Sequence, residues 1–173
     1  MGTDSRITPL VVCDAGPLIH LDELDSLPLL RDFPSVLVPE VVWSEVEGHR
    51  PHIFDLPNPP LVRVRPRHSP RPALAALSRL MPLHASETQA LQIAEEHGDD
   101  LLLTDDTAAR LAARELQLPV HGTLGLLLRA IRRGQHSRQE VLDMLRAIPG
   151  RSTLHIKPSL LLEVIAEVER TVG

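Results

Sequence analysis

The stretch Val11-Val12-Cys13-Asp14-Ala15-Gly16-Pro17-Leu18-Ile19 decides the fold class of this 173-residue chain. Its apolar residues predict a short buried strand that ends at Asp14, and the following Gly16 and Pro17 open a helix. Leucines continue at helical spacing as far as a break near Pro28. Short apolar strands that run directly into amphipathic helices are typical of α/β proteins with a parallel sheet.

The same alternation of strand and helix continues along the chain. Apolar runs at 36–38, 101–104 and 119–120 predict further strands, and the alternating residues 61–65 predict a short edge strand. Amphipathic helices follow, including one that we expect to open at Ser86. We therefore expect a parallel sheet covered on both faces, with ligands bound beyond the carboxyl ends of its strands.

The chain is long enough for one domain. We assign residues 1–150 to this domain and residues 151–173 to a helical extension, whose helix begins near Pro158. Residues 51–82 hold eight of the 16 prolines, a density that excludes long helices and central strands. Because periodic structure resumes on both sides, we interpret 51–82 as an excursion within the domain.

The composition excludes several classes of protein. The 18 Lys and Arg against 23 Asp and Glu give a net charge of −5, which argues against a generic nucleic-acid coat protein. Two Phe, one Trp and no Tyr offer almost no platform for stacked bases. The single cysteine, Cys13, allows neither an intramolecular disulfide nor a thiolate zinc site. Since neither a hydrophobic signal region nor an apolar run of about 20 residues is found, we expect a soluble, cytoplasmic protein.

Carboxylates follow two of the expected core strands. Asp14 ends the first, and Asp105 and Asp106 end the strand at 101–104. If these strands are neighbours, about 4.8 Å apart, their carboxylates converge and repel unless a divalent cation joins them. Hard oxygen ligands suit Mg²⁺ or Mn²⁺. Glu45 and Glu87 stand near the starts of helices that follow the same edge of the sheet.

Each of these acids also has a purely structural interpretation. Asp14 could accept backbone hydrogen bonds in its turn, and Asp106 could cap the next helix. Glu87 suits the first turn of a helix in which Ser86 and Gln89 complete a capping box. Glu45 could belong to a solvated helix face. The joint pattern, rather than any one residue, favours a metal site.

A receiver-like phosphoacceptor domain is an alternative, because such domains also gather acids around Mg²⁺ at strand ends. They require a lysine near the acidic pocket. Lys157 is the only lysine, and it lies far towards the C-terminus in a Lys-Pro context. The phosphoacceptor interpretation is therefore the weaker one.

Several segments resemble the PIN-domain family, in the order in which that family has them. They are Val11–Ile19, Val38–Val42 with Glu45, Ser86–Leu91 and Leu102–Asp106, and the later Leu118–Leu127 and Arg132–Gly134 resemble one bacterial and archaeal subgroup. The resemblance covers roughly residues 9–147 and implies a three-layer α/β/α fold with a parallel sheet of four or five strands.

The resemblance also implies an activity. PIN domains are metal-dependent ribonucleases, and many are the toxins of VapBC toxin–antitoxin pairs. The family's acidic set corresponds here to Asp14, Glu45, Glu87 and Asp106, with Asp105 as an adjacent alternative ligand. Glu87 stands where PIN toxins more often have Asp. The implied protein is an endoribonuclease that uses Mg²⁺ or Mn²⁺, acts on RNA, forms a homodimer and is inhibited by a small antitoxin protein.

An acidic nuclease still needs cations to bind the phosphate backbone. Arginine offers bidentate phosphate contacts, and we expect RNA contacts from two clusters, Arg63, Arg65 and Arg67, and Arg132 and Arg133. The structural alternative is that these cations lie on solvated surface, as at helix C-termini. The functional alternative is a PIN fold without catalysis, retained to bind RNA or protein.

Overall fold

The structure is a computed structural model that describes residues 10–55, 61–98 and 100–170. Its strands are β1 Val11–Cys13, β2 Val36–Pro39, β3 Leu61–Val64, β4 Leu101–Leu103 and β5 Val120–His121. Its helices are α1 Ala15–Glu23, α2 Glu40–His49, α3 Pro72–Leu80, α4 Ala85–Glu96, α5 Thr107–Glu115, α6 Thr123–Arg132, α7 Arg138–Arg151 and α8 Pro158–Arg170, with 3₁₀ turns at Leu27–Asp32 and Pro51–Asp55. The first nine residues, where the sequence predicts no signal region, lie outside this description.

The strands form one sheet in the order β3-β2-β1-β4-β5, and every pair of neighbours is parallel. Strand β1 lies at the centre, with Val12 paired to Leu37 of β2 and to Leu102 of β4. The backbone N–H of Asp14 also donates to the carbonyl oxygen of Leu103 at 2.9 Å. The prediction of an α/β fold with a parallel sheet is confirmed, and the two strands that end in aspartate are neighbours.

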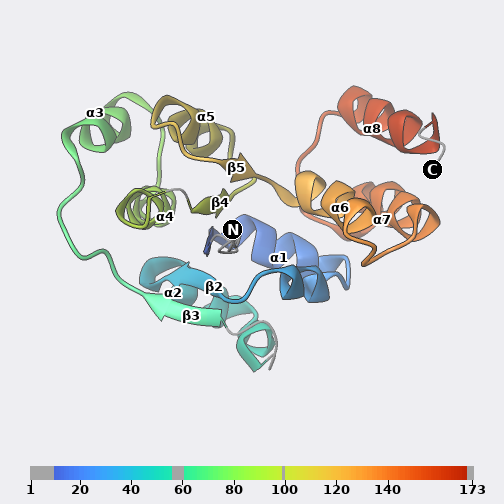
Figure 1. Cartoon of the computed structure of the whole chain (residues 1–173), viewed down its shortest axis with the longest axis horizontal. Coiled ribbons are helices and arrows are strands. Elements are labelled where there is room, and N and C mark those ends of the chain that lie inside the picture. The colour runs from blue at the N-terminus through green and yellow to red at the C-terminus, as the bar shows by residue number, and fades with distance from the viewer. Residues whose placement is uncertain (1–9, 56–60, 99, 171–173) are drawn as a thin grey trace, which may run out of the picture.

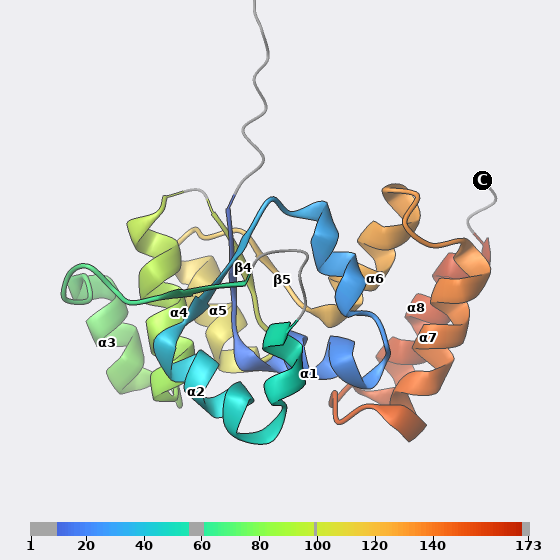
Figure 2. The same cartoon turned by 90° about the horizontal axis from the view of Figure 1, so that it is seen from below.

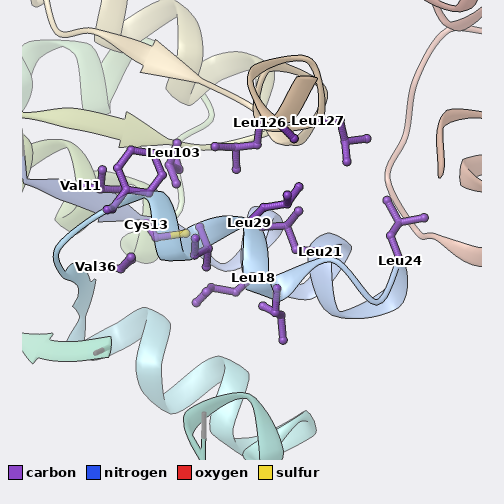
Figure 3. Packing of buried hydrophobic residues seen from close by; sticks show 14 of the residues in the cluster. Val11, Cys13, Leu18, Leu21, Leu24, Leu29, Val36, Leu103, Leu126 and Leu127 are labelled. Atoms are coloured by element: carbon purple, nitrogen blue, oxygen red, sulfur yellow. The ribbon is translucent and has the colours of Figure 1, made fainter. Parts of the chain in front are cut away.

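Alternate residues of the central strands face opposite sides of the sheet, as strand geometry requires. Val11 and Cys13 belong to one apolar cluster, and Val12 between them belongs to the other. The first cluster is completed by leucines of α1 and α6, whose labelled side chains belong to the packing shown in Figure 3, and by residues of α7 and α8. The second is completed by α3, α4 and α5. The molecule is therefore a three-layer α/β/α sandwich.

The proline-rich segment contains more regular structure than its composition suggests. Strand β3 lies at the sheet edge, as predicted. Helix α3 was not expected, but Pro72 stands in its first turn, where the missing N–H of proline costs nothing. Leu74 of α3 is fully buried in the second cluster. Residues 56–60 of the segment are outside the described residues.

The C-terminal part, residues 151–170, ends in α8, which begins at Pro158 as predicted. Figures 1 and 2 show α6, α7 and α8 grouped at one end of the molecule, away from α3, α4 and α5. Leu161 and Val168 of α8 are buried in the same cluster as β1. Within the described residues, no helix has the length and apolar character needed to span a membrane.

Candidate active site

All five acids singled out in the sequence line one pocket at the carboxyl ends of β1 and β4. The pocket has a volume of about 420 Å³. Its walls are Asp14, Ala15, Gly16, His20, Glu45, Ser86, Glu87, Asp105, Asp106, Thr107, Thr153, Leu154 and His155. We call it the acidic pocket; neither Arg nor Lys is among these residues.

Asp14 is the most deeply buried of the acids, with 5% of its surface exposed. Its Oδ1 accepts the backbone N–H of Ala15 at 2.8 Å, which caps α1, and its Oδ2 accepts the Thr104 hydroxyl at 2.9 Å. Burial raises the pKa of Asp14 to about 6, since these two hydrogen bonds only partly offset the lost hydration, and the charges of Glu87 and Glu45 raise the pKa further.

Glu87 stands in the first turn of α4, but the predicted start of this helix is wrong. The helix begins at Ala85 after His84, whose backbone is extended, so Ser86 is already inside the first turn. Glu87 Oε2 accepts the backbone N–H of His84 at 2.6 Å. A carboxylate is a strong acceptor for an unpaired N–H at a helix start, and it is Glu87, rather than the predicted Ser86 and Gln89 pair, that satisfies it. Burial raises the pKa of Glu87, and the charges of Asp106 and Glu45 act in the same direction.

The adjacent residues Asp105 and Asp106 have different surroundings. Asp105 accepts the backbone N–H and the hydroxyl of Thr123 at 2.7 and 2.6 Å, and its Oδ2 lies 2.8 Å from His20 Nδ1. It therefore joins the start of α6 to α1. Asp106 uses one oxygen to accept the N–H of Ala109 at 2.7 Å, while its other oxygen accepts no hydrogen bond from the described residues.

Comparison with known proteins identifies the family of this chain. The model of the family described as DUF3368, a PIN domain, matches residues 10–170. The chain belongs to the PIN-domain family. A PilT N-terminus domain protein from the hyperthermophilic archaeon Sulfolobus solfataricus has a similar structure, with a TM-score of 0.55, 17% identity, and coverage of 70% of this chain and 93% of that one. No curated protein matches the chain.

PIN domains are generally nucleases and typically use divalent metals, so the acidic pocket lies on a nuclease-type fold that suggests nucleic-acid binding. Within the described residues, no three His, Cys, Asp or Glu side chains stand close enough together to hold an ion as they are. The donors nevertheless suit a hard divalent cation, because the pocket concentrates carboxylate oxygens. Burial of Asp14 beside Glu87 and Glu45 leaves negative charge that a cation would neutralise.

None of the five arginines predicted to contact RNA lines the acidic pocket. Arg63 and Arg65, in and just after β3, both pair with Glu40 at 2.9 and 2.5 Å. The backbone N–H of Arg67 donates to Glu96 at 2.8 Å. Arg132 and Arg133 lie at the end of α6 that points away from Thr123 and the pocket, and Arg133 pairs with Asp32 at 2.8 Å.

Several residues of the site escaped the prediction from sequence. Thr104 has a local signal, since it is the polar residue that ends an apolar strand directly before two acids. His20 has no such signal, because only the fold of α1 brings it to Asp105. Thr153, Leu154 and His155 have none either, because they reach the pocket from about 50 residues beyond Asp106.

Proposed function

We propose that this PIN-domain protein is an endoribonuclease that depends on Mg²⁺ or Mn²⁺. The observation that supports it best is the gathering of Asp14, Glu45, Glu87 and Asp106 in one pocket at the carboxyl ends of neighbouring parallel strands. Four separate segments of the chain contribute these acids. If each acid had only a local structural role, such as capping its own helix, the four side chains would have no reason to line the same pocket.

Asp14, Glu87 and Asp106 would hold the cation directly, and Glu45 directly or through water. When bound, a divalent cation lowers the pKa of water and stabilises charge on a phosphoryl group. Thr104 donates to Asp14 Oδ2 and so favours the ionised carboxylate that a cation requires. Asp105 is already held by Thr123 and His20, so we assign it the role of positioning α6 rather than that of the principal ligand.

The predicted arginines remain candidates for contacts with the RNA backbone. Arg63 and Arg65 lie at the carboxyl end of β3, on the same edge of the sheet as the acids and two strands from β1. That separation is about 10 Å. Their pairing with Glu40 must be shared or exchanged when phosphate binds, as it must for Arg133 and Asp32.

The finer proposal is that the nuclease is the toxin of a VapBC-like pair, acting as a homodimer and held inactive by a small antitoxin. The likeness to the PIN family supports it. A reading frame for a small DNA-binding protein directly upstream, and growth arrest on expression of this chain that co-expression of that protein relieves, are the expected findings.

The test of the nuclease is Asp14→Asn, which keeps the shape of the side chain but removes its charge. We expect purified wild-type protein to cleave RNA only with Mg²⁺ or Mn²⁺ and the variant to lose at least 100-fold in rate, about 3 kcal/mol of barrier. Asp143→Asn is the matched control, because Asp143 is exposed on α7 outside the pocket. Full cleavage by the Asp14 variant would refute the assignment.

A second candidate is a PIN fold that binds RNA or protein without cleaving. One observation favours it, namely that the described acids do not converge as a ready metal site. This candidate predicts no metal-dependent cleavage and no thermal stabilisation by Mn²⁺ at millimolar concentration. The phosphoacceptor interpretation gains nothing from the family, which is of nuclease type.

A further inference from the structure

A second cavity adjoins the acidic pocket and has the opposite charge character. Its volume is about 480 Å³. Its basic side chains are Arg110 of α5, His121 of β5, and His155 and Lys157 of the segment before α8. It shares Asp105, Thr107, Leu154 and His155 with the acidic pocket. We call this cavity the basic groove.

The basic groove has four basic side chains and one carboxylate. Asp105 is the only acid among its lining residues, and its oxygens already accept hydrogen bonds from Thr123. Within the described residues, neither Arg110 nor Lys157 forms an ion pair. By contrast, Arg63, Arg65 and Arg133 are all paired with acids.

The turn between β5 and α6 leaves room for the guanidinium group of Arg110. A Cβ at Gly122 would lie 2.7 Å from Arg110 Nη1 and 2.5 Å from Asp105 Oδ1. The guanidinium group and the carboxylate therefore occupy the space that any other residue at 122 would fill. Gly122 has an ordinary φ of −110°, so close approach, rather than backbone strain, explains the glycine.

The segment that carries His155 and Lys157 is anchored to α1 at its first two residues. The carboxylate of Glu23, whose side chain is 7% exposed, accepts the backbone N–H of Thr153 at 2.7 Å and the hydroxyls of Ser152 and Thr153 at 2.9 and 3.0 Å. The segment 152–157 is thereby fixed across the carboxyl edge of the sheet. It carries the only lysine of the chain to the wall of the cavity that Asp105 also lines.

We propose that the basic groove binds the phosphodiester backbone of the nucleic-acid strand next to the phosphate that enters the acidic pocket. Arg110 and Lys157 contact the flanking phosphates, and His155 stands where the two cavities meet. This inference rests on the proposed nuclease function, because it places the phosphate that is cleaved in the acidic pocket and the adjacent part of the nucleic-acid strand in the basic groove. The lining residues of the groove include neither Phe, Tyr nor Trp, so we expect charge rather than base stacking to supply most of the binding.

The test measures binding separately from cleavage. A fluorescent single-stranded RNA of about ten nucleotides is titrated in EDTA, and fluorescence anisotropy gives its Kd over a series of salt concentrations. We expect Arg110→Gln and Lys157→Gln each to weaken binding about 3- to 10-fold. Each should also reduce the slope of log K against log salt by about 0.7, the value for one phosphate contact to a single strand.

Arg79→Gln is the matched control. It removes the same charge from the last turn of α3, where Arg79 is exposed and lines neither the acidic pocket nor the basic groove. Its Kd and salt slope should equal those of the wild type. Melting temperatures of all variants show that they are folded.

Lys157 allows a second measurement, because an amine-reactive acetylating reagent modifies only this lysine and the N-terminal amine. Mass spectrometry should show that saturating RNA slows acetylation of Lys157 at least 5-fold. Equal acetylation with and without RNA, or an Arg110 and Lys157 double variant that binds as the wild type does, would overturn the groove. A wild-type protein that does not bind the RNA would also refute the proposed groove. RNA binding that depends on Arg110 and Lys157, without any Mn²⁺-dependent cleavage, would refute only the proposed nuclease function.

Discussion

At the scale of single residues, Asp14 shows how the site opposes the stability of the fold. Its carboxylate is buried, and its pKa is raised from 3.8 to about 6. An acid with a raised pKa in the folded state favours unfolding wherever it is ionised in both states. The penalty is full above pH 6 and disappears as the pH falls towards 4, where folded and unfolded chains both bind the proton.

We therefore expect Asp14→Asn to stabilise the metal-free protein. At pH 7.5 the gain should be about 3 kcal/mol, from a shift of about two pKa units, and it should shrink towards zero at pH 4. Thermal or urea unfolding in EDTA at the two pH values measures it. Asp143→Asn should change little at either pH, and a lower stability of Asp14→Asn at pH 7.5 would show that the ionised carboxylate is stabilised by the fold.

At the scale of elements, the turn between β5 and α6 holds Asp105, which lines both cavities. Asp105 at the end of β4 accepts hydrogen bonds from Thr123 at the start of α6, and Gly122 leaves room for both Asp105 and Arg110. A pattern of apolar residues predicts that a strand and a helix follow one another here. It does not show which side chains lie against the turn.

Gly122→Ala should destabilise the protein by about 1–3 kcal/mol, the usual cost of overpacking, because the added Cβ meets Asp105 and Arg110. Gly48→Ala is the matched control, since nothing lies within 4 Å of a Cβ there. In helix α2 the same change should stabilise by about 0.5–1 kcal/mol. Urea unfolding of both variants gives the comparison, and equal effects of the two substitutions would contradict the close approach at Gly122.

At the scale of the whole molecule, charge is distributed unevenly. The net charge of −5 does not show how the charges are distributed. The acidic pocket has neither Arg nor Lys in its walls, whereas the basic groove, which shares four residues with that pocket, is lined by both. The composition alone argued against a protein that coats nucleic acid, and that conclusion still holds. That conclusion does not exclude a site that binds a single nucleic-acid strand at one place on the surface.

This charge arrangement predicts that Mn²⁺ stabilises the protein in a pH-dependent way. Since a cation binds the folded state and requires ionised carboxylates, millimolar Mn²⁺ should raise the Tm at pH 7.5. The rise should diminish below pH 6, where protons compete for Asp14. Differential scanning fluorimetry measures both, and Asp14→Asn should respond less at pH 7.5. A Tm that Mn²⁺ leaves unchanged at pH 7.5 would favour the binding module.

Much of the fold was predictable because its signals are local. Apolar runs of three or four residues and the acids that end them predicted the strands and a parallel sheet. The strand order, and with it the pairing of β1 with β4, was decided by the structure. Helix α3 was not predicted, because the density of prolines argues against a helix. The burial of Leu74, which stabilises this helix, is visible only in the folded structure. The start of α4 was misplaced because two capping pairs overlap, and only the backbone of His84 decides between them.

The sequence by itself determined the fold class and the identity of the candidate acids. The periodicity of strands and helices, and the residue that ends each strand, are local signals that can be identified from neighbouring positions. Only the tertiary structure decided which side chains share a cavity. Lys157 looked too remote to act near the acids, yet Glu23 fixes the segment before it across the edge of the sheet. The physical reason is that hydrogen bonds between residues about 130 positions apart leave no periodic trace in the chain.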